Sequence, residues 1–181
     1  MISLWSLGFD VRVKGNDDLS QSADPTIWPS ALDNLRQAPS FNEKFQLESN
    51  WIDLLPSLAA LLALVPNAFQ LGVVIEVSTS LVAFDGLEGF AGLRGRPTAK
   101  VELHHKSTVL GFDVLDPRTL TSALSFEPGL TLANGVTTAS GKLLASYEQA
   151  HELAKYADEQ FSEHAPFFAA EIRVWKQNIG A

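Results

Sequence analysis

Alternation of apolar and polar residues is the sequence feature that most limits how this chain can fold. It occurs over residues 7–13, over 99–103 and 110–114, and again over 168–174. Successive side chains of a β-strand point to opposite faces, so each of these segments predicts a half-buried strand. The apolar side changes parity between the two middle segments, which predicts a bulge near Ser107.

Helical periodicity is clearest over residues 142–161. Apolar residues recur there at spacings of three and four, and Glu148, Glu152, Lys155 and Glu159 fall on the opposite side. This is the pattern of an amphipathic helix that packs one face on a core.

A second helix is expected to begin near Pro56, because proline is tolerated in the first turn, and to end at Pro66. A short helix is expected over residues 29–37, and a further strand over 71–77 that continues toward Phe84. Strands early, in the middle and at the end of the chain, with helices between them, predict an α+β fold. We expect a mixed or antiparallel sheet with helices packed on it.

The chain of 181 residues is expected to form a single α+β domain over residues 1–181, because chains divide into several domains only when they are considerably longer. Hydrophobic residues make up 46%, enough to bury a core and to exclude a disordered chain. We find no internal repeat and no linker that would divide the sequence.

Composition excludes several classes of function. Cysteine is absent, so disulfides, cysteine–zinc sites and thiol nucleophiles are excluded. The formal net charge of −8 argues against nucleic acid as a partner, since phosphate binding needs clustered lysine and arginine. No cofactor and no metal are expected from these patterns.

Membrane and secretion signals are not found in the sequence. The first nine residues are apolar but carry no basic residue, unlike a secretory signal. The longest apolar stretch, Leu54 to Phe69, is interrupted by Pro56 and Pro66 and is too short for a spanning helix, which needs about 20 residues. We expect a cytoplasmic protein without membrane contact.

Several motifs are close to known sites but incomplete. Residues 135–142 resemble a phosphate loop, yet the glycine spacing is one residue too long and Leu143 replaces the Ser or Thr that binds magnesium. Glu148 and His151 form half of a di-metal pattern without a second copy. Ser140 lies in no nucleophile motif and serves equally well as a helix cap.

Acidic residues gather in three places, at Asp17-Asp18, at Asp113 with Asp116, and at Asp158, Glu159 and Glu163. Such clusters are usually solvated faces. The functional alternative is a negative surface that docks a basic partner, where complementary charge speeds encounter and sets specificity.

Two segments resemble bacterial polymorphic-toxin immunity proteins. The first runs from Leu110 to Leu124, and the second from Glu163 to Phe168. The positions that carry the resemblance are Gly111, Phe112, Asp113, Val114, Asp116, Ser122 and Leu124, then His164, Ala165, Pro166 and Phe167. Together they cover about 20 residues of the chain.

The resemblance implies a small cytoplasmic, non-enzymatic protein that binds and neutralises a cognate toxin domain. No catalysis or cofactor would be required, and the expected partner is a basic protein toxin. The candidate partner-binding residues are Asp113, Asp116, Asp158, Glu159 and Glu163. For Asp113 and Asp116 a structural role at the end of a strand also stays open.

Two other classes of function stay open at this point. One is a small-molecule-binding protein or a hydrolase-type enzyme, which would join His104, His151 or His164 to a carboxylate in a pocket. The other is a structural or assembly subunit, because Tyr156 lies off the apolar stripe of the predicted helix, beside Gln149 and Gln160.

Overall fold

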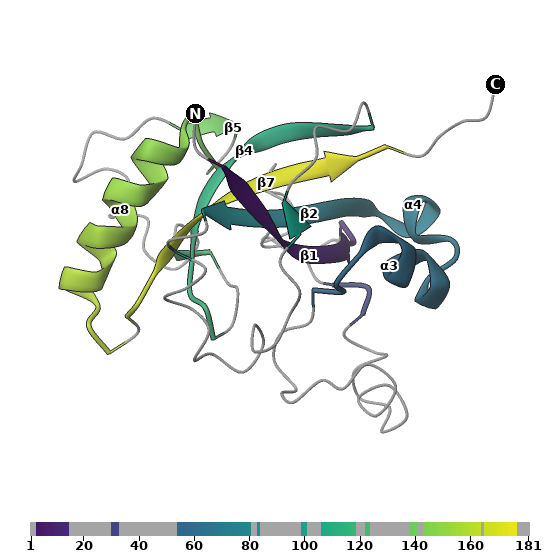
Figure 1. Ribbon diagram of the computed structural model, residues 1–181, viewed down its shortest axis with the longest axis horizontal. Coiled ribbons are helices and arrows are strands. Elements are labelled where there is room, and N and C mark those ends of the chain that lie inside the picture. Colours follow the sequence, from purple (N-terminus) through teal and green to yellow (C-terminus); the bar gives the residue numbers. More distant parts are fainter. Residues whose placement is uncertain are drawn as a thin grey trace.

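One antiparallel sheet runs through both halves of the chain (Figure 1). The computed structural model describes residues 3–14, 30–32, 54–80, 83, 99–100, 106–118, 122–123, 138–140, 143–163 and 165–176. Within them the sheet has seven strands in the order β3-β1-β2-β7-β4-β6-β5, and neighbouring strands are antiparallel throughout. The predicted α+β class is confirmed, in its antiparallel form.

The strands are β1 (Leu4–Arg12), β2 (Val73–Ser80), β3 (Ala99–Lys100), β4 (Ser107–Leu115), β5 (Thr138–Ser140), β6 (Leu143–Leu144) and β7 (Phe168–Trp175). The helices are α3 (Leu58–Leu64), α4 (Ala68–Leu71) and α8 (Tyr147–Gln160). No helix among the described residues is long and apolar enough to span a membrane.

The predicted elements that fall on described residues are found, with shifted ends. Helix α8 begins five residues later than expected, because Leu143 and Leu144 form β6 and the cap is Ser146. Ser140, a candidate cap in the sequence, lies in strand β5. The helix expected over residues 29–37 falls largely outside the described residues.

The structure corrects the prediction that the chain has no internal repeat. Strand β1 pairs with β2 in the same register in which β4 pairs with β7: Phe9 lies opposite Glu76, and Phe112 lies opposite Glu171. Both pairs carry a register shift at the same place, before Gly8 and before Gly111. The two strand pairs are therefore equivalent along their whole length.

Sequence identity supports this equivalence. The five letters LGFDV occur at residues 7–11 and again at 110–114, and the letters SAL occur at 30–32 and at 122–124. Each half also has two leucines followed by a serine, Ser57 or Ser146, whose hydroxyl caps a helix. The chain is an internal duplication of one strand–helix–strand unit.

A local twofold axis relates the two units. Strands β2 and β7 pair with each other, and Val77 lies opposite Ile172. These two residues occupy equivalent positions in their units, so the axis passes between them, perpendicular to the sheet. An axis in that direction keeps both units on the same face, and α3 and α8 accordingly lie over opposite ends of one sheet face (Figure 1).

Each unit fastens its SAL segment to its first strand through a buried aspartate. The Oδ1 atom of Asp10 accepts a hydrogen bond from the Ser30 hydroxyl at 2.6 Å, and that of Asp113 accepts one from the Ser122 hydroxyl at 2.7 Å. In both units the same oxygen also accepts the backbone N–H of the following valine. Both carboxylates are fully buried, so these bonds replace water that the groups have lost.

The core lies on both faces of the sheet. On the helix face, Phe9 and Val11 pack under α3, and Val114 packs under α8. On the other face, Leu7 and Leu110 belong to one cluster with strand residues from both units. Fully burying such a side chain contributes roughly 1.5–3 kcal/mol, so both faces stabilise the sheet.

The middle of the chain departs from the predicted strand pattern in two ways. The bulge lies between Val109 and Gly111 instead of near Ser107, so Leu110 points to the opposite face from Phe112. In β7, Glu171 and Arg173 were expected on a wet face, but both are buried and form an ion pair. Strand β7 is central in the sheet, and its second face is covered as well.

Candidate partner-binding surface

Helix α8 carries the main charged surface of the described structure. Its N-terminus is fixed by Ser146, whose hydroxyl accepts the backbone N–H of Gln149 at 3.2 Å, and the Gln149 side chain accepts the N–H of Ala145 in return. This reciprocal arrangement satisfies donors that a helix start leaves unpaired. The helix packs Tyr147, Ala150, Leu153, Ala154 and Ala157 onto the sheet. Small alanines let the helix lie close to β4 and β7.

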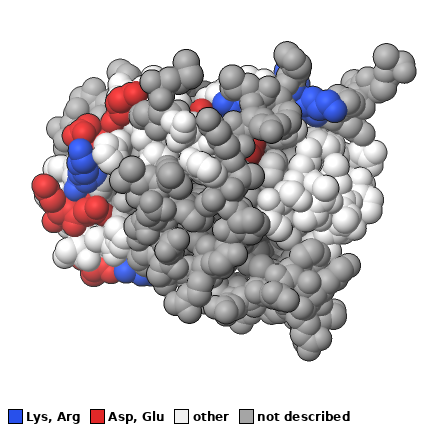
Figure 2. Space-filling model, in the orientation of Figure 1, with Lys and Arg blue, Asp and Glu red and all other residues white. Residues whose placement is uncertain are grey.

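The opposite side of α8 is acidic. Glu148, Glu152 and Glu159 are exposed on the helix, and Glu163 is exposed in the turn that follows. Lys155 is the basic residue among them. In Figure 2 red side chains gather at the end of the molecule where α8 lies. We call Glu148, Glu152, Glu159 and Glu163 the α8 acidic surface.

The other acidic residues of the described structure are used inside the fold. Asp10, Glu76, Asp113, Asp116 and Glu171 are all buried. Asp10 and Asp113 hold the SAL segments, Glu76 accepts the indole N–H of Trp175 at 3.0 Å, and Glu171 pairs with Arg173. The fully exposed carboxylates of the described residues are thus confined to α8 and the turn after it.

The five predicted contact residues differ in how far the structure exposes them. Asp113 has no exposed surface, which removes it from the predicted contact surface. Asp116 is also buried, and it turns the chain after β4 by accepting the backbone N–H of Arg118 at 2.7 Å. For both residues the structure shows the structural role that the sequence had left open.

The three predicted residues at the end of α8 lie close to one another along the chain. Asp158 is half-buried and accepts the backbone N–H of Phe167, which ties the helix to the segment before β7. Glu159 and Glu163 are exposed. Glu148 and Glu152 were not among the candidate residues, although their spacing already placed them on the outer side of the predicted helix.

The electrostatic effect of these acids differs along α8: Glu148 lies in the first turn, where the positive end of the helix dipole favours an acid. Glu159 lies in the last turn of α8, where the helix dipole is negative and no basic residue offsets it. Lys155 donates a hydrogen bond to Glu152 at 2.9 Å and holds the pKa of that carboxyl below its ordinary value. Of the three glutamates on the helix, Glu159 is therefore the one that the helix dipole disfavours.

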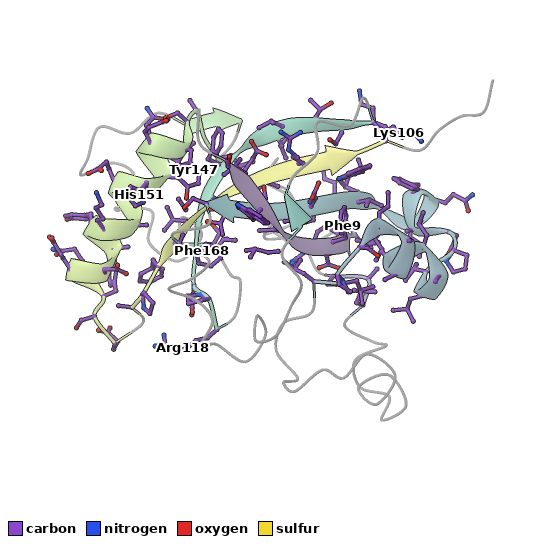
Figure 3. The ribbon with its side chains drawn as sticks, in the orientation of Figure 1. Phe9, Lys106, Arg118, Tyr147, His151 and Phe168 are labelled. Carbon is purple, nitrogen blue, oxygen red and sulfur yellow. The ribbon has the colours of Figure 1, made fainter. Side chains whose placement is uncertain are left out.

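His151 is the one histidine among the described residues that could serve the enzyme alternative. His151 is exposed on α8, and its ring stacks on Tyr147 with 6.3 Å between centroids (Figure 3). The Tyr147 hydroxyl accepts the backbone N–H of Ser80 at 3.3 Å, on the sheet side of the helix. No group of metal-ligating side chains is found in the described part of the chain. His104, His105 and His164 lie outside it.

Three of the residues behind the resemblance to immunity proteins, Gly111, Asp113 and Ser122, hold the fold together in this structure. A Cβ atom at Gly111 would lie 2.8 Å from the Cβ of Leu143, so β6 can approach β4 there only because the residue is glycine. Asp113 and Ser122 form the buried hydrogen bond of the second unit. These three residues are buried and belong to the framework of the fold.

Comparison with known proteins adds no relative. The chain matches no protein-family model, no curated protein and no solved structure.

Proposed function

We propose that this chain is an immunity-type protein that binds a cognate toxin domain through the α8 acidic surface and performs no catalysis. The observation that carries the proposal is the distribution of carboxylates. Inside the fold, acidic residues are buried and hydrogen-bonded, whereas the exposed ones of the described structure stand together on one helix. A set of exposed carboxylates that is concentrated in one place suits an external basic partner.

The charge of such a surface acts mainly on the association rate and on the choice of partner. Opposite potentials raise the rate of encounter and reject partners of the wrong sign, more than they raise affinity. Many toxins that cleave nucleic acids need basic substrate channels, and an acidic helix can cover such a channel. In this proposal the protein works in the cytoplasm of the cell that makes it.

The test uses an inactivated copy of the toxin domain encoded beside this chain. We expect a one-to-one complex, rescue of growth when the active toxin is co-expressed, and an association rate that falls as salt rises. The double variant Glu159→Gln, Glu163→Gln removes two charges from the α8 acidic surface. We expect it to slow association about 3- to 10-fold at low salt.

The matched control is the double variant Asp17→Asn, Asp18→Asn, which changes the net charge equally outside α8. We expect its association rate to stay within about twofold of the original protein. Absence of both binding and growth rescue would overturn the immunity function. Equal slowing by the two double variants would assign association to net charge and remove α8 as the contact surface.

A further inference from the structure

Helix α3 is apolar on every side but is mostly not buried. Its seven residues, Leu58–Leu64, are all leucine or alanine. Only Leu61 is buried, whereas Ala59 and Ala63 are exposed and the other four residues are half-buried. A helix that is hydrophobic all round is normally covered on all sides by protein. The outer side of α3 lacks the charged and polar residues that a helix in contact with water carries.

The equivalent helix of the second unit shows that the framework does not require an apolar outer side. Counted from the serine that caps each helix, Glu148 of α8 corresponds to Ala59 of α3. Glu152 corresponds to Ala63 in the same way, and both glutamates are exposed. Charged residues at these positions are thus compatible with a helix that packs on this sheet. Contact with a second protein surface explains the apolar residues of α3 better, because exposed apolar patches mark such contacts.

The uncharged surface extends beyond α3. No Asp, Glu, Lys or Arg occurs from Leu54 to Ile75, and Leu71 at the end of α4 is 46% exposed. The described surface over α3 and α4 is white in Figure 2, where charged side chains are coloured. The cores of protein–protein interfaces are depleted of charged residues in the same way. We call the following residues the α3 apolar surface: Leu58, Ala59, Leu62 and Ala63.

The distribution of charge indicates a second copy of this chain as the partner. Each copy has a formal net charge of −8, so two copies repel each other least where they meet through a surface without charge. A twofold contact sets a surface patch against the same patch of the other copy. The α8 acidic surface would then face carboxylates, whereas the α3 apolar surface would face uncharged side chains. Helices α3 and α8 lie over opposite ends of the sheet, so contact through α3 keeps the two acidic surfaces far apart (Figure 1).

We propose that two copies of this chain form a dimer through the α3 apolar surface, with a second twofold axis between α3 of one copy and α3 of the other. Ala59 and Ala63 are about one helical turn apart, and their small side chains let two helices approach closely. Leu58 and Leu62 flank them and lose their remaining contact with water, which stabilises the dimer. The α8 acidic surface stays accessible in both copies. The dimer does not depend on the toxin-binding function proposed above.

The mass of the full chain in solution tests for the dimer. Sedimentation equilibrium should give twice 19.7 kDa at high protein concentration and should approach 19.7 kDa on dilution. Raising the salt concentration should strengthen the dimer, because salt screens the repulsion between two copies of charge −8. This dependence on salt has the opposite sign to the one expected for a basic partner on α8.

The variant Ala63→Glu tests which surface forms the contact. Because α8 carries a glutamate at the equivalent position, the far-ultraviolet circular dichroism should stay unchanged. A charge in an apolar contact loses its water without gaining a partner, so the dissociation constant of the dimer should rise at least about 10-fold. The matched control Ser162→Glu adds the same charge at an exposed position after α8. Its dissociation constant should stay within about twofold of the original protein.

Distances between the two copies test the same surface without changing it. The chain has no cysteine, so Gln70→Cys in α4 and Ser162→Cys after α8 each provide a single site for a spin label, and both positions are exposed. In a dimer through α3, labels at position 70 should lie closer to each other across the dimer than labels at position 162. The measurement is double electron–electron resonance on each labelled dimer.

Four results would overturn the proposal. One is a mass of 19.7 kDa at every salt concentration, up to millimolar protein. Another is a dimer that salt weakens. The third is a dimer that Ala63→Glu leaves intact or weakens no more than Ser162→Glu does. The last is a shorter distance between labels at position 162 than between labels at position 70.

Discussion

The two duplicated units share a framework and differ on their surface. Counting from the cap serines Ser57 and Ser146, the outer positions Ala59 and Ala63 of α3 correspond to Glu148 and Glu152 of α8. No charged residue occurs from Leu54 to Ile75. The described surface over α3 and α4 is correspondingly uncoloured in Figure 2.

This difference distinguishes the residues that hold the fold together from residues of the surface that can be substituted. Residues that recur in both units, such as the aspartate of LGFDV and the serine of SAL, are buried and hydrogen-bonded. The acids Glu148 and Glu152, which replace alanines of the first unit, stand on the outer face of α8. A copy that keeps the framework can alter its exposed positions at little cost, because surface substitutions usually change stability by less than about 0.5 kcal/mol.

Substitution of the buried leucines Leu55 and Leu144 should have the largest effect on the free energy of unfolding. Leu55 and Leu144 are equivalent, fully buried, and paired with Phe9 and Phe112. Leu55→Ala and Leu144→Ala should each lower the free energy of unfolding by about 2–5 kcal/mol. Because β2 and β7 join the units in one sheet, both variants should unfold in a single transition in urea, followed by circular dichroism and tryptophan fluorescence. Two separate transitions would show that the units are independent.

Substitution of Ser30 or Ser122 should have an intermediate effect on the free energy of unfolding. Ser30→Ala and Ser122→Ala each leave a buried aspartate short of one donor, so each should destabilise the protein by roughly 1–3 kcal/mol. Ser162→Ala, at an exposed position, is the control and should change stability by less than about 0.5 kcal/mol. If only one of the two serine substitutions lowered the free energy of unfolding, the two hydrogen bonds would not be equivalent. The measurement is again urea denaturation.

The smallest effect on stability is expected for the pair of Lys155 and Glu152 on the outer face of α8, since α3 has no such charged face. Lys155 lowers the pKa of Glu152 from its ordinary value of 4.5, so this pair stabilises the folded protein above that value and loses its contribution as pH falls through the folded pKa. Both side chains are exposed, so salt should weaken the effect. In Lys155→Gln, the Glu152 midpoint from carboxyl NMR should rise. An unchanged midpoint would mean that the lysine does not set it.

Local patterns of the sequence identified most of the regular elements. Alternation found β1, β4 and β7, and the helical stripe found α8, because both periodicities depend on which neighbours share a face. The ends were less certain. Leu143 continued the apolar stripe of the predicted helix, yet it pairs in β6, since contact with β5 decides its conformation.

The candidate site was only partly accessible from the sequence. Glu159 and Glu163 are exposed as expected, and Glu148 and Glu152 could have been included from their helical spacing. Asp113 looked like a surface acid because it alternates with the apolar residues Phe112 and Val114 and Asp116 follows three residues later. Its burial depends on Ser122, nine residues away, which reaches it only in the folded chain.

The order of residues by itself determined the α+β class, through the periods of two and of three to four, and it held the repeated letters LGFDV and SAL. Tertiary structure alone decided that those repeats form equivalent units about one axis, and which carboxylates are enclosed and which face outward. The reason is physical: periodicity acts between neighbours along the chain, whereas burial and strand pairing join residues that are far apart in it.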